Sequence, residues 1–199
     1  MKNVLYDGVF APNAASEKVF LFTPTGEISY AAFTLMTNRL ANCLVKNGLQ
    51  SGDRVAVQAA KSVTQLALYA ATIKAGGVYL PLNTGYTPHE LDYFVGDATP
   101  TVIVVADSIS AAITPLAAGI GATLLTLNAD ETGSLTMKAN TESADFLTIA
   151  RGSEDLAAIL YTSGTTGRSK GAKLCHRNLL SNTKVLAENW KFSSNDVLL

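Results

Sequence analysis

The sequence predicts an α/β fold in which a largely parallel sheet is flanked by helices. Short apolar, β-branched runs alternate with helical segments through most of the 199 residues. This is the pattern of parallel strands joined by crossover helices. Apolar residues form 48% of the chain and charged residues 16%, a composition that indicates a buried interior and argues against disorder.

The first predicted element is a β-hairpin, with strands over 19–22 and 27–30 around the turn 23–26. The turn has proline early and glycine late, an order that favours chain reversal. A helix follows, capped by Ser29 and ended by Gly48. Its apolar positions are three and four residues apart and predict one buried stripe, at Tyr30, Phe33, Met36, Leu40 and Leu44.

Strands and helices then alternate. Strands are predicted over 54–59, 78–82, 101–106, 122–127 and 156–162. Helices are predicted over 62–74, 88–95, 108–118 and 176–190. The polar segment 130–142 is interpreted as an irregular surface excursion, and 196–199 as the beginning of a further strand. In open sheets of this kind, ligands bind at the carboxyl ends of the strands.

The most informative segment is a glycine- and hydroxyl-rich run after the apolar strand. It reads Tyr-Thr-Ser-Gly-Thr-Thr-Gly-Arg-Ser-Lys-Gly over 161–171. Glycines let backbone N–H groups approach a ligand, hydroxyl groups are orientable donors, and a lysine ammonium suits phosphate. The run therefore predicts a cradle for a polyphosphate, formed by Thr162, Ser163, Gly164, Thr165, Thr166, Gly167, Arg168, Ser169, Lys170 and Gly171.

Two other interpretations of this run are weaker. A flexible Gly/Ser/Thr linker rarely carries a lysine directly after a buried strand. The GxxxxGK[ST] phosphate loop requires glycine before the lysine and a hydroxyl residue after it, whereas Ser169 precedes Lys170 and Gly171 follows it. The spacing thus indicates a different phosphate loop.

The run resembles the signature phosphate loop of the adenylate-forming enzymes, which include acyl-CoA synthetases, firefly luciferase and the adenylation domains of peptide synthetases. The segments 48–57, 75–83 and 90–95 also resemble this family. Within it, the second of these segments and the ending Arg168-Ser169-Lys170 most resemble the malonyl-CoA synthetases. Most of the family has proline where this chain has Ser169.

This resemblance implies an acyl-CoA synthetase. Such an enzyme activates a small carboxylic acid, for which malonate is the best candidate, as an acyl-adenylate and transfers the acyl group to coenzyme A. It uses ATP with Mg²⁺, and CoA is its co-substrate. The resemblance implies Lys170 and Thr165 as catalytic residues. No carboxylate pair dedicated to the metal ion is identified.

The resemblance also implies that 1–199 is the N-terminal portion of an AMP-binding domain whose remainder lies further along the chain. We therefore expect the 199 residues alone to be inactive. We also expect them to expose apolar sheet surface that favours association with another copy. The alternative is a non-catalytic fragment, or a binding or assembly module, that keeps the fold.

Composition argues against several other classes of protein. The net charge is −1 and no cluster of Lys or Arg supports nucleic-acid binding. No apolar run approaches the roughly 20 residues that cross a bilayer, and the N-terminus lacks a secretory signal. The spacing of Cys43, Cys175, His89 and His176 fits no metal site, and we expect His176 to be structural. A reduced, cytoplasmic location is the default expectation.

Overall fold

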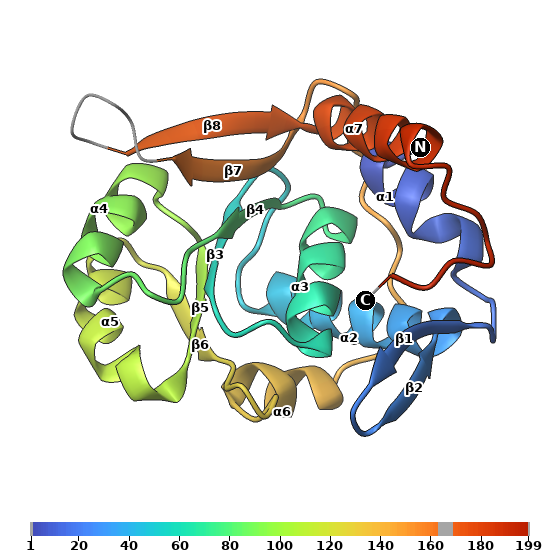
Figure 1. Ribbon diagram of the computed structural model, residues 1–199. Helices are drawn as coiled ribbons and strands as arrows, with labels where there is room; N and C mark the ends of the chain where they lie inside the picture. The colour runs from blue at the N-terminus through green and yellow to red at the C-terminus, as the bar shows by residue number, and fades with distance from the viewer. Residues whose placement is uncertain (1, 163–168, 199) are drawn as a thin grey trace.

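The computed structural model describes residues 2–162 and 169–198, which form a two-stranded hairpin and a six-stranded sheet flanked by helices (Figure 1). The strands are Val19–Thr23 (β1), Gly26–Ser29 (β2), Arg54–Gln58 (β3), Val78–Pro81 (β4), Val102–Val105 (β5), Thr123–Thr126 (β6), Leu156–Thr162 (β7) and Lys170–Cys175 (β8). The larger sheet has the order β6-β5-β3-β4-β7-β8. Its neighbours are parallel except for the antiparallel pair β7 and β8. The predicted fold class is confirmed.

Helices cover both faces of the sheet. They are Val4–Val9 (α1), Tyr30–Lys46 (α2), Val63–Lys74 (α3), Pro88–Ala98 (α4), Asp107–Gly119 (α5), Ser134–Asn140 (α6) and His176–Asn189 (α7), with a 3₁₀ turn at Ala11–Asn13. Successive strand residues point to opposite faces. In β3, therefore, Val55 and Val57 pack with α2, α3 and α6, whereas Ala56 packs with α4 and α5.

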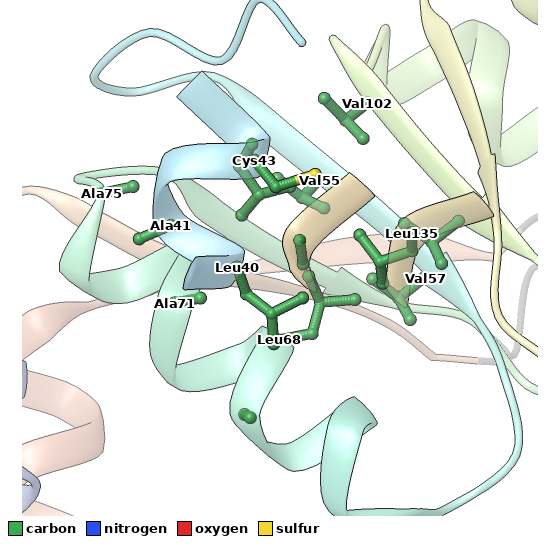
Figure 2. Packing of buried hydrophobic residues seen from close by; sticks show 14 of the residues in the cluster. Leu40, Ala41, Cys43, Val55, Val57, Leu68, Ala71, Ala75, Val102 and Leu135 are labelled. Atoms are coloured by element: carbon green, nitrogen blue, oxygen red, sulfur yellow. The ribbon is translucent and has the colours of Figure 1, made fainter. Parts of the chain in front are cut away.

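Small side chains bring α2 and α3 close to each other and to the sheet. Figure 2 shows Leu40 and Ala41 of α2 beside Leu68 and Ala71 of α3, with Val55 of β3 nearby. All five side chains are almost completely buried. Alanine at helix contacts permits a short interaxial distance, while leucine and valine fill the space against the sheet.

The predicted hairpin and the helix that follows it are confirmed. Strands β1 and β2 pair antiparallel and reverse direction between Thr23 and Gly26. The hydroxyl of Ser29 accepts a hydrogen bond from the N–H of Ala32 at 3.1 Å, which satisfies one of the free donors at the start of α2. Helix α3 is capped in the same way by Ser62, whose hydroxyl accepts from Gln65.

Two expectations about local structure are wrong. The segment 130–142 contains the helix α6, whose start is tied to β6 by hydrogen bonds of 2.9 Å from each backbone N–H of Thr126 and Ser134 to the hydroxyl of the other residue. The described residues 196–198 form no strand. The predicted strand 156–162 is confirmed as β7, and β8, which begins at Lys170 within the run 161–171, is a strand that the sequence analysis does not predict.

The N-terminal helix α1, which the sequence pattern does not predict, packs against α7 (Figure 1). Asn3 caps α1, and its side-chain amide donates to the carbonyl oxygens of Ile73 at 2.8 Å and Ile149 at 2.9 Å. His176, fully buried at the start of α7, accepts the N–H of Leu5 at its Nδ1 atom at 3.2 Å. The structural role expected for His176 therefore consists of joining the two helices.

Gly133 provides a test of the close contact at the start of α6. Its φ is +138°, and a Cβ placed there would collide with the carbonyl of Thr126. Gly133→Ala is expected to lower the free energy of unfolding by about 2–4 kcal/mol, from backbone strain and overpacking together. Gly26→Ala is the control, since Gly26 has φ +146° with no atom near its Cβ position. Urea denaturation of both variants would contradict this account if Gly133→Ala cost no more than Gly26→Ala.

His176 is expected to make stability depend on pH. Burial, and secondarily the charge of Arg151, hold its pKa below the ordinary value, although Asp155 opposes them. The unfolded chain binds this proton more tightly, so the free energy of unfolding is highest above about pH 6.5 and falls as the pH drops below that value. The decline stops near the lower pKa of the folded state.

Urea denaturation between pH 7.5 and pH 5 measures this effect, with a slope of up to about 1.4 kcal/mol per pH unit from one group. His176→Asn is expected to flatten the slope. His89→Asn is the matched control, because His89 is the other histidine and is exposed. An equal slope in wild type and His176→Asn would contradict the assignment.

Candidate functional site

The candidate site lies on the stem formed by β7 and β8. The two strands pair antiparallel, with Thr162 opposite Lys170 and Tyr161 opposite Gly171. Strand β7 runs parallel to β4, so Thr162 lies at the carboxyl edge of the sheet. The predicted cradle residues between the strands lie outside the described residues: Ser163, Gly164, Thr165, Thr166, Gly167 and Arg168.

Four of the predicted site residues are described and lie together at the end of this stem. Thr162 and Lys170 are exposed, whereas Ser169 is half-buried. Within the described part of the chain, Lys170 has no ion-pair partner. Its exposed ammonium group is of the kind that binds phosphate and other anions.

Gly171 has a packing role in the stem. A Cβ at this position would lie 3.0 Å from Cγ2 of Ile159 and 3.4 Å from Cε1 of Tyr161. The side chains of these two β7 residues therefore occupy the space that a larger residue at position 171 would need. This contact explains a glycine at position 171 without reference to any ligand.

Helix α4 supports the stem through contacts that the sequence analysis missed. The hydroxyl of Tyr93 donates to the carbonyl oxygen of Ser169 at 2.8 Å. The hydroxyl of Tyr161 donates to the carboxylate of Asp97, and its ring packs on that of Phe94 with centroids 4.6 Å apart. In Figure 1 the end of β7 at Thr162 and the start of β8 at Lys170 lie beside α4. In the sequence, the only sign of these contacts was the pair of aromatic residues in segment 90–95. The sequence analysis used that segment only for its resemblance to a family.

The electrostatics of this contact keep the Tyr161 hydroxyl protonated. Burial, followed by the hydrogen bond to Asp97 and its negative charge, raises the pKa of Tyr161. A protonated phenol is the donor that a carboxylate acceptor requires. The contact is therefore maintained throughout the physiological pH range.

The start of α4 is also fixed. Thr87 and Glu90 form a capping box, in which the N–H of Thr87 donates to the Glu90 carboxylate at 2.8 Å and the N–H of Glu90 donates to the Thr87 hydroxyl at 3.3 Å. The first of these bonds is the main reason that the pKa of Glu90 lies below its ordinary value. The helix that supports the stem therefore has a defined first turn.

Within residues 2–162 and 169–198, no group of three or more His, Cys, Asp or Glu side chains is arranged to hold a metal ion. In the same residues, no helix combines the length and the hydrophobicity needed to span a membrane. The described part of the site contains the hydroxyl of Thr162 and the ammonium of Lys170, donors that suit an anion.

Comparison with known proteins gives one family. The family model described as "AMP-binding enzyme" matches residues 10–199. The mitochondrial malonate–CoA ligase ACSF3 of Mus musculus is 33% identical over 162 residues, which are 81% of this chain and 27% of that relative. The chain therefore spans much less than half the length of this relative.

Solved structures also match this chain over nearly its whole length. Apo MatB from Rhodopseudomonas palustris is 52% identical, with a TM-score of 0.95 over 98% of this chain and 39% of that one. The ATP-bound structure of the same MatB has a TM-score of 0.94 over the same shares. The fold of this chain thus matches a segment of a longer protein that has been solved with ATP.

Proposed function

This chain belongs to the AMP-binding enzyme family, and from that premise we propose that it is the N-terminal portion of an ATP-dependent acid–thiol ligase. The proposal rests mainly on the sequence of the run 161–171. This run begins on β7 and ends on β8, the two strands of the stem at the carboxyl edge of the sheet. The ATP-bound structure of MatB, 52% identical over nearly the whole chain, supports it. The activity belongs to the longer protein of which this chain is a part.

The proposed reaction has two steps. A carboxylate oxygen of the acid attacks the α-phosphorus of ATP, the bond to the β-phosphate oxygen breaks, and pyrophosphate leaves with the bonding electrons. The thiolate of coenzyme A then attacks the acyl carbon of the adenylate, and AMP leaves. A carboxylate is a weak nucleophile, so the protein contributes chiefly by aligning the reactants and stabilising the leaving group.

The role of the site follows from where charge develops. Negative charge increases on the β- and γ-phosphates as pyrophosphate leaves. The exposed ammonium of Lys170 and the hydroxyl of Thr162, together with Thr165 and the other loop residues, would stabilise that charge. Magnesium would arrive with ATP as its complex and neutralise part of the phosphate charge.

Replacing Lys170 tests the proposal. Lys170→Ala, made in the ligase as its gene encodes it, is expected to slow adenylation by about 10²–10³, the scale for losing one preorganised electrostatic donor. Acid-dependent exchange of pyrophosphate into ATP measures this step. Lys173→Ala is the matched control, since Lys173 is an exposed lysine of β8 three positions further on, on the opposite face. An unchanged exchange rate in Lys170→Ala would remove Lys170 from the mechanism.

We propose malonate as the acid. The similarity to ACSF3, a malonate–CoA ligase, supports this choice, as does the similarity of segment 75–83 and of the ending Arg168-Ser169-Lys170 to malonyl-CoA synthetases. A second carboxylate would distinguish malonate from acetate at the acyl site.

Substrate comparison tests the choice of acid. In the same exchange assay, kcat/KM for malonate is expected to exceed that for acetate by at least about 10²-fold, because acetate leaves the partner of the second carboxylate unpaired. Methylmalonate and a longer monocarboxylic acid complete the series. Equal values for malonate and acetate would contradict malonate specificity but leave the ligase proposal intact.

A further inference from the structure

Helix α4 contacts both arms of the stem next to the predicted nucleotide loop. On the arm that enters the loop, Tyr161 precedes the last residue of β7 and donates to Asp97. On the arm that leaves it, Ser169 precedes the first residue of β8, and its carbonyl oxygen accepts from Tyr93. The two contacts therefore hold the two ends of the same loop.

The two α4 residues are suited to act together. Tyr93 and Asp97 are four positions apart, so they lie one above the other on the same face of the helix. Phe94 lies between the stem and the core, packing on Tyr161 at 4.6 Å and on Tyr86 at 4.8 Å between ring centroids. One helix face thus presents an acceptor, a donor and an aromatic surface to the stem.

Helix α4 is itself firmly anchored. Its buried residues Leu91, Phe94, Val95 and Ala98 pack against strands β3, β4 and β5 and helix α5. Its first turn is held by the Thr87–Glu90 capping box. Because α4 is fixed to the sheet and its core, its hydrogen bonds to the stem limit the movement of both arms.

We infer that Tyr93 and Asp97 are positioning residues, which hold the two arms of the stem so that Thr162 and Lys170 are preorganised for the phosphates of ATP. This inference rests on the proposed function. Tyr93 fixes the peptide group between Ser169 and Lys170, from which the lysine side chain starts. Asp97 fixes Tyr161, next to Thr162. Without these bonds, binding the nucleotide would have to order the stem as well, which weakens affinity.

The alternative is that these bonds only stabilise the fold. The two roles predict different measurements. Loss of a purely structural bond lowers the thermal midpoint and affects ATP and acid alike. Loss of a positioning bond raises KM for MgATP while KM for the acid and the thermal midpoint stay constant.

The experiment compares Tyr93→Phe, Asp97→Ala and Asp97→Asn in the ligase as its gene encodes it, with pyrophosphate exchange as the assay. Tyr93→Phe and Asp97→Ala are each expected to raise KM for MgATP by about three- to tenfold, the equivalent of one hydrogen bond. Asp97→Asn keeps a carbonyl acceptor for Tyr161 and is expected to stay within about twofold of wild type.

Two control variants match these changes. Tyr86→Phe removes a hydroxyl from the same aromatic group, and that hydroxyl has no hydrogen bond to any described residue. Asp92→Ala removes an exposed carboxylate from the same helix. Both are expected to leave KM for MgATP unchanged.

Amide hydrogen exchange provides a second readout that needs no activity. Tyr93→Phe is expected to speed exchange in peptides covering 161–175, while peptides from α2 and α3 keep the wild-type rate. Unchanged exchange and unchanged KM for MgATP would overturn the positioning role. If the wild-type ligase shows no acid-dependent pyrophosphate exchange, the proposed function fails, and the amide hydrogen exchange rates still decide whether α4 holds the stem.

Discussion

Burial of both faces of the central strands is the constraint on which the rest of the structure depends. Strands β3 and β5 are almost completely buried, so each must send alternate side chains into two different helix layers. This requirement explains their aliphatic composition and the position of α2 and α3 on one face and of α4 and α5 on the other. It also fixes the carboxyl edge of the sheet, where the run proposed to bind phosphate leaves β7.

The site departs from this regular pattern in an informative way. Strand β8 turns back antiparallel to β7, and its residues are mostly exposed. The stem therefore has little core of its own near the loop and depends on its contacts with α4 for lateral support. The exposed residues Thr162 and Lys170 at the end of this stem are thus accessible to a ligand, while the helix beside the stem supports its strands.

Local patterns in the sequence predict the elements that local physics determines. The Ser29 cap, the β-branched run of β5 and the hairpin turn 23–26 each depend on neighbouring residues. Helix α6 escapes prediction because it has seven residues, of which only Leu135 and Ala139 are buried. The contacts of α4 with the stem could not be predicted for a different reason, because Tyr93 and Ser169 are 76 positions apart. No periodicity connects residues at such a distance.

The hydrogen bond between Leu5 and His176 spans 171 positions, nearly the length of the chain. Closing so large a loop depends on the sheet being formed first, which is a feature of slow folding. During synthesis the ribosome releases α1 long before α7 exists, so the contact between these two helices forms late. The apolar surface around Leu5 and Tyr6 is exposed for that interval, in which a chaperone could bind it.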